Sequence, residues 1–73
     1  MPRSRLYLVG EGLMVGYVKE LKKKDLYRVE WDEPFRLIVS ISRGRVATSI
    51  KDQSGETREF PNERGCQFKR RVG

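Results

Sequence analysis

The chain has no histidine and a single cysteine, and these two features exclude several kinds of chemistry. Histidine is the side chain that most often moves protons in catalysis, and without it the thiol of Cys66 has no imidazole partner to activate it. One cysteine cannot close a disulfide within the chain, which is typical of a reducing compartment, and it cannot hold a zinc ion by itself. We therefore expect a protein that is not an enzyme, with no catalytic residue, metal or cofactor.

Long apolar runs are also absent. No stretch approaches the ~18 residues that are needed to span a bilayer. The start of the chain, MPRSRLYLVGEGLMVG, is basic, but its apolar part is interrupted by Gly10, Glu11 and Gly12, unlike a secretory signal peptide. These observations predict a cytoplasmic protein, monomeric and without membrane attachment.

The 73 residues suffice for a single domain with one small core. Alternating apolar and polar residues predict an all-β fold. Extended runs lie at 5–9, 13–20, 25–31, 35–42, 45–51 and 56–60, with turn signals at 32–34, 43–44 and 52–55. The basic C-terminal segment, residues 64–73, is either a last strand or a partly disordered tail. Five or six short strands are typical of a small antiparallel barrel or of a twisted sheet.

The alternation also predicts which side chains face the core. In the third run, Tyr27, Val29 and Trp31 share one face, and we place Trp31 in the core. In the fourth run the apolar face is formed by Phe35, Leu37, Val39 and Ile41. Gly16 interrupts the second run and indicates a bulge or a tight bend.

The stretch GYVKELKKKDLYRVEWD resembles the first hairpin of SH3-like barrels such as Tudor, chromo-barrel and KOW modules. Those families show a Gly-x-Val strand, a charged loop and then Tyr-x-Val-x-Trp-Asp. The matching residues are Gly16, Val18, Tyr27, Val29, Trp31 and Asp32. The resemblance implies an SH3-like barrel, so the expected fold is such a barrel or a five- to six-stranded twisted sheet.

As a whole, the short, basic, all-β chain resembles small phage-encoded regulators of transcription in size and character. Among them are the antiterminator and RNA polymerase inhibitor of Xanthomonas phages. The resemblance implies a protein that binds bacterial RNA polymerase in the host cytoplasm and changes transcription by inhibition or antitermination. No motif aligns, so no binding residue is carried over.

The charge balance favours an acidic partner. The net charge is +6 and the isoelectric point is near 9.9, which fits nucleic acid, an anionic surface or an acidic protein. Lys22, Lys23 and Lys24 form one basic cluster, on the loop of the expected first hairpin. Lysines at such a loop also prevent aggregation, and we favour that role over phosphate binding here.

Two further basic clusters lie later in the chain. Arg43 and Arg45 flank a turn glycine and could grip a phosphate or carboxylate with two hydrogen bonds, or could be there for solvation. The last cluster surrounds Phe68, whose ring could stack on a base or anchor the chain. Its members are Arg64, Lys69, Arg70 and Arg71.

The first extended run offers another kind of site. A short terminal run is expected at a sheet edge, where it can pair with an extended segment of another protein. The residues concerned are Arg3, Arg5, Tyr7 and Val9.

Two hypotheses follow. In the first, the protein is an adaptor that docks on a large assembly such as RNA polymerase, through the edge run together with Arg43 and Arg45. In the second, it is a nucleic-acid-binding barrel in its own right, whose lysine triplet and last basic cluster contact DNA or RNA phosphates. We favour the adaptor, because ten acidic residues are scattered among sixteen basic ones and most aromatics are assigned to the core. Mixed charge suits a protein interface.

Overall fold

The computed structural model describes residues 7–8 and 12–70, and it confirms the all-β class. One short 3-10 turn, η1 (Val18–Glu20), accompanies the strands. The strands are β1 (Tyr7–Leu8), β2 (Leu13–Tyr17), β3 (Leu26–Arg28), β4 (Arg36–Arg43), β5 (Ala47–Asp52), β6 (Thr57–Pro61) and β7 (Gly65–Lys69). Residues 64–73 are predicted to be either a last strand or a partly disordered tail, and within them Gly65–Lys69 forms a strand.

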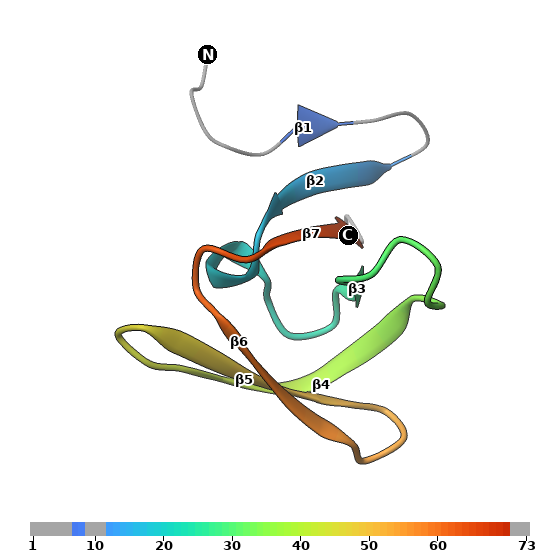
Figure 1. The fold of residues 1–73 in the computed structure, drawn as a ribbon. Helices are drawn as coiled ribbons and strands as arrows, with labels where there is room; N and C mark the ends of the chain where they lie inside the picture. The colour runs from blue at the N-terminus through green and yellow to red at the C-terminus, as the bar shows by residue number, and fades with distance from the viewer. Residues whose placement is uncertain (1–6, 9–11, 71–73) are drawn as a thin grey trace.

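The strands form one antiparallel sheet in the order β1-β2-β7-β3-β4-β5-β6. In Figure 1, β1, β2 and β7 lie side by side in one half of the molecule, and β4, β5 and β6 form the other half. Among the described strands, β1 and β6 end the sheet and do not pair with each other. Of the two expected architectures, the twisted sheet is the one that forms, and it does not close into a barrel.

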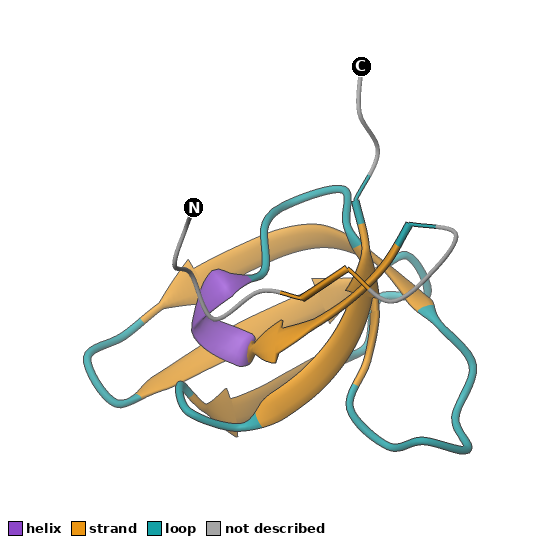
Figure 2. Cartoon of the chain, turned by 90° about the horizontal axis from the view of Figure 1, so that it is seen from above, coloured by secondary structure: helices purple, strands orange, loops and turns teal. Residues whose placement is uncertain are grey.

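The expected first hairpin is wrong. β2 and β3 do not pair with each other, because β7 lies between them and pairs with both. After Tyr17 the chain turns into η1 (Figure 2), and this turn brings Val18 and Leu21, three residues apart, into the core together. The backbone N–H of Tyr17 donates to the Glu20 carboxylate at 3.1 Å and fixes the start of the turn.

The predicted irregularity lies in a different strand. Gly16 pairs with Cys66 in an unbroken register, so β2 has no bulge there. The register shifts in β4 instead, between Ile38 and Ser40. The shift changes the alternation, so that Ile38 is buried and Ile41, three residues later, also packs against the core. The sequence places Leu37 and Val39 on the core face of this strand, and this prediction is wrong, because Ile38 is the residue that is buried there.

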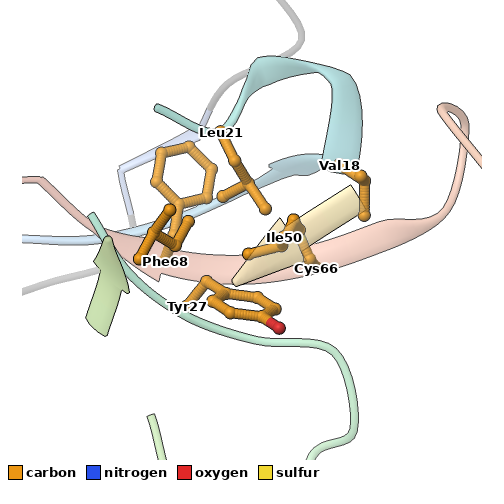
Figure 3. Close-up of a cluster of buried hydrophobic side chains, with 7 residues drawn as sticks. Val18, Leu21, Tyr27, Ile50, Cys66 and Phe68 are labelled. Atoms are coloured by element: carbon orange, nitrogen blue, oxygen red, sulfur yellow. The ribbon is translucent and has the colours of Figure 1, made fainter. Parts of the chain in front are cut away.

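The core lies between the two halves of the sheet. Figure 3 shows its side chains converging from β3, β5, β7 and the η1 region. Burial raises the pKa of the Cys66 thiol to about 12, and nearby carboxylates add to the shift, so the thiol is protonated at neutral pH. The fully packed residues are Val18, Leu21, Tyr27, Ile38, Ile50, Cys66 and Phe68.

Trp31 is not in the core, which corrects the expectation from the sequence. Its side chain is 75% exposed. The reason is that β3 ends at Arg28, so the alternation that would have turned Trp31 inward stops before it is reached.

Candidate nucleic-acid interface

One face of the sheet points away from the core. Residues paired across antiparallel strands share a face. Tyr27 pairs with Phe68, and both are buried, so they mark the core face of β3 and β7. The residues beside them in each strand point the other way, and Leu26 pairs with Lys69 of β7 and Leu37 of β4. We call this side the outer face; it carries Leu13, Val15, Leu26, Arg28, Leu37, Gln67 and Lys69, all partly or fully exposed.

Two aromatic rings and two cations gather at one end of the outer face. The guanidinium carbon of Arg28 lies 5.6 Å from the centre of the Trp31 ring and 4.5 Å from that of Phe35. The ammonium of Lys69 lies 4.9 Å from the Phe35 ring centre. Arg28 also donates from Nε to the side-chain oxygen of Gln67 at 2.6 Å. We call Arg28, Trp31, Phe35 and Lys69 the aromatic cluster.

The cations of the aromatic cluster carry uncompensated charge. Within residues 7–8 and 12–70, neither Arg28 nor Lys69 forms an ion pair with a carboxylate. A ring face attracts a cation without neutralising it, so the charge remains available to an anion. The cluster therefore combines the exposed ring of Trp31 and the partly buried ring of Phe35 with two positive charges.

A short turn places Trp31 in its exposed position. The carboxylate of Glu33 accepts hydrogen bonds from the backbone N–H of Val29 at 2.7 Å and of Glu30 at 3.0 Å. Burial acts to raise the pKa of Glu33, but these hydrogen bonds and Arg58 outweigh it and hold that pKa below its usual value. A carboxylate that stays ionised keeps the loop closed, so Trp31 is presented on an ordered turn.

The lysine triplet also lies on an ordered turn. The carboxylate of Asp25 accepts a hydrogen bond from the backbone N–H of Lys22 at 2.9 Å, and the N–H of Lys24 donates to the carbonyl of Ile38 in β4 at 2.8 Å. Lys24 has a φ of 79°, a left-handed conformation that glycine adopts more easily. We call residues 22–25 the lysine turn.

A hollow of about 530 Å³ opens beside the lysine turn. The one acidic residue in its wall, Asp25, is 2% exposed and receives two hydrogen bonds from Arg70, at 3.2 and 3.0 Å. Because Arg70 neutralises Asp25, the charge of the lysines is left uncompensated. The hollow is lined by Lys22, Lys23, Lys24, Asp25, Leu37 and Arg70.

Three of the arginines that the sequence assigned to binding have partners within the fold. Arg43 donates to the carbonyl of Lys19 at 3.1 Å and also to that of Leu21, so it ties β4 to the η1 region. Arg64 pairs with Glu30 at 2.9 Å, and Arg70 pairs with Asp25 as described. Arg45 is exposed and has no ion pair among the described residues.

The edge run is only partly described. Arg3, Arg5, Val9 and Arg71 lie outside the described residues. Tyr7 belongs to β1, where its backbone pairs with Val15. β1 ends the strand order, so the expected position at a sheet edge is confirmed for Tyr7 and Leu8.

Sequence reasoning missed Arg28, Trp31 and Phe35. The available signal was the run WDEPF, in which two acids and a proline follow the tryptophan directly. Such residues favour a turn over a strand, so Trp31 lies in a loop rather than at the end of a buried strand.

A second group of arginines is paired with carboxylates. Arg36 lies 2.9 Å from Asp52 and 2.8 Å from Glu56, and Arg58 lies 3.1 Å from Glu33. We call these five residues the ion-paired cluster. Its arginines are neutralised by carboxylates, in contrast to the cations of the aromatic cluster.

The turn between β5 and β6 supports the ion-paired cluster. One carboxylate oxygen of Asp52 accepts hydrogen bonds from the backbone N–H of Ser54 at 2.9 Å and from its hydroxyl at 2.6 Å. Gly55 follows with a φ of 93°, so the turn predicted at 52–55 is confirmed. Hydrogen bonds from Ser54 and Arg36 lower the pKa of Asp52 to about 2.

No protein-family model, curated protein or solved structure matches the chain. Over the described residues, no helix has the length and apolar character that crossing a membrane requires. The same residues contain no group of acidic or cysteine side chains that could hold a metal ion.

Proposed function

We propose that the protein binds single-stranded nucleic acid on its outer face. Trp31 and Phe35 stack against bases, and Arg28 and Lys69 contact the phosphates between them. Proteins that bind single strands combine such stacking rings with a positively charged surface. Every base has a π-face, so binding of this kind tolerates different sequences.

The observation that carries the proposal is the exposure of Trp31 beside uncompensated cations. A buried tryptophan stabilises a small domain, whereas an exposed one on an ordered turn contributes little to folding and is typical of binding sites. The apolar residues Leu26 and Leu37 extend the same face toward the lysine turn. A surface that is both apolar and positive fits bases and phosphates together.

A single strand fits better than a duplex. Bases stack on protein rings only where they are not stacked within a helix. Reading a duplex commonly requires a helix or a two-stranded ribbon inserted in the major groove. The only helical element among the described residues is the three-residue η1, and the exposed ring of Trp31 suits unpaired bases.

The adaptor that the sequence favoured is the second candidate. A regulator that docks on bacterial RNA polymerase could use β1, whose place at the sheet edge supports pairing with an extended segment. The two reasons for ranking it first no longer hold. Most acidic residues are engaged in ion pairs, and Trp31 and Phe35 lie outside the core. Stoichiometric binding to purified, nucleic-acid-free RNA polymerase, without affinity for oligonucleotides, would favour the adaptor over the nucleic-acid-binding protein.

The test is fluorescence anisotropy with labelled oligonucleotides. The protein should bind a mixed-sequence single strand more tightly than the matching duplex. Trp31→Ala should weaken single-strand binding about 5- to 150-fold, because stacking on one base is worth about 1–3 kcal/mol. Val46→Ala is the matched control, since Val46 is 77% exposed but follows the far end of β4. Equal affinity of Trp31→Ala and the unmodified protein would contradict the proposal.

A further inference from the structure

The lysine turn forms a second part of the same site. We infer that the hollow beside it holds backbone phosphates of the strand whose bases stack on Trp31 and Phe35. This inference rests on the proposed function, and it gives the bound strand a path across the outer face, from stacked bases at one end to held phosphates at the other.

The aromatic cluster and the hollow are continuous on the sheet. Lys69, which lies over the Phe35 ring, pairs with Leu26, and the other partner of Leu26 is Leu37, a wall of the hollow. Arg28 and Leu26 are two residues apart on β3, about 7 Å along the strand. Neighbouring nucleotides of one strand can therefore reach both places.

The lysine turn is built to hold its charges in place. A hydrogen bond from the backbone N–H of Lys24 to the carbonyl of Ile38 fixes the turn to β4. The carboxylate of Asp25, at the end of the turn, forms an ion pair with Arg70. Lysines that serve only solubility need no ordered backbone and no buried ion pair beneath them. Lys24 also keeps a side chain in a left-handed conformation that favours glycine, so the turn retains a charge at a cost in stability.

Phosphate is the anion that this hollow suits best. An ammonium is a compact charge that binds phosphate without needing a particular fork geometry. Three of them line the hollow, and Leu37 adds an apolar wall that suits a sugar or a base edge. A carboxylate partner would gain the same attraction, but it would make no use of the adjacent rings.

The experiment compares the salt dependence of single-strand binding in variants matched for charge. Lys22→Ala/Lys24→Ala and Lys51→Glu each remove two units of charge, and Lys51 is exposed on β5, outside the outer face. The double variant should bind more weakly and flatten the plot of log affinity against log salt by about 0.7 for each phosphate that the lysines no longer neutralise. Lys51→Glu should leave that slope unchanged. Lys24→Gly relieves the left-handed backbone and should flatten the slope by itself, with the fold intact.

The outcomes separate the two proposals. If the unmodified protein binds single strands through Trp31 but the double variant keeps the full slope, the hollow is not a phosphate site and this inference is overturned. If the unmodified protein binds no single strand at all, the proposed function is wrong, and the inference that rests on it is wrong as well. Tighter binding to vesicles of anionic lipid than to the oligonucleotide, abolished in the double variant, would assign the lysines to a membrane surface and also overturn the inference.

Discussion

Arg36 and Arg28 lie on neighbouring strands in opposite surroundings. Arg36 reaches three carboxylates, those of Asp52, Glu56 and Glu33. Arg28 instead lies against the rings of Trp31 and Phe35, with no carboxylate partner in the described chain. A cation neutralised by carboxylates contributes to the fold. A cation held against rings keeps its charge for a partner.

The same difference separates the aromatic cluster from the ion-paired cluster. The net charge of +6 is not spread evenly, because the carboxylates are concentrated in the ion-paired cluster and in the pairs of Asp25, Glu30 and Glu63. The aromatic cluster and the lysine turn therefore account for most of the uncompensated positive charge among the described residues. Localised charge steers an anionic partner to one face.

The largest expected effect contrasts two phenylalanines near the same strands. Phe68→Ala removes a fully buried ring and should lower the free energy of unfolding by about 3–5 kcal/mol. Phe35→Ala removes a ring outside the core and should cost less than about 1 kcal/mol while weakening single-strand binding. Urea denaturation measures the first quantity and oligonucleotide anisotropy the second. Similar decreases in stability in both variants would mean that the outer face belongs to the core.

An intermediate effect contrasts two arginines. Arg58→Gln breaks the pair with the half-buried Glu33 and should lower the free energy of unfolding by about 1–2 kcal/mol. Because the Glu33 carboxylate still accepts its hydrogen bonds from the backbone N–H groups of Val29 and Glu30, the turn that carries Trp31 stays closed and affinity for single strands should be unchanged. Arg28→Gln should do the opposite: affinity falls about tenfold and stability changes by less than about 0.5 kcal/mol. Each variant loses one charge, so net charge cannot explain a difference. If both variants lost affinity equally, the contrast between the two clusters would be wrong.

The smallest expected effect is a pH dependence confined to the ion-paired cluster. The pKa of Asp52 in the folded protein is about 2, below its ordinary value of 3.8. Its contribution to stability is therefore complete above pH 3.8 and is lost as the pH falls toward 2. Denaturation curves across this range should show a falling free energy of unfolding, and Asp52→Asn should flatten that fall. An equal fall in the Asn variant would assign the acid sensitivity to other carboxylates, such as Glu33.

The sequence predicted the strands well, because alternation and turn residues are local signals. The turn at 52–55 follows from its own aspartate and glycine, and β4 and β5 lie close to their expected bounds. The pairing of β7 between β2 and β3 could not be predicted, since it joins residues about 40 to 55 positions apart. Local pattern carries no information about such contacts.

The candidate site was harder to predict than the fold. The sequence singles out four basic residues of the site: Lys69, which it assigns to nucleic-acid binding, and Lys22, Lys23 and Lys24, for which it favours solubility over binding. Arg43 and Arg70 were assigned to binding but hold distant segments together, which only the tertiary contacts show. Trp31 was assigned to the core because alternation was continued past the end of β3. A tryptophan followed by acids and proline is better interpreted as the start of an exposed turn.

The most direct test of the account uses the only tryptophan in the chain as its own reporter. Unlabelled single-stranded oligonucleotide is titrated into the unmodified protein while the emission of Trp31 is recorded. The account predicts saturable quenching that weakens with salt and is much smaller with the matching duplex, because only unpaired bases stack on the ring. Emission that stays constant while the oligonucleotide binds would contradict it, since the strand would then lie away from Trp31.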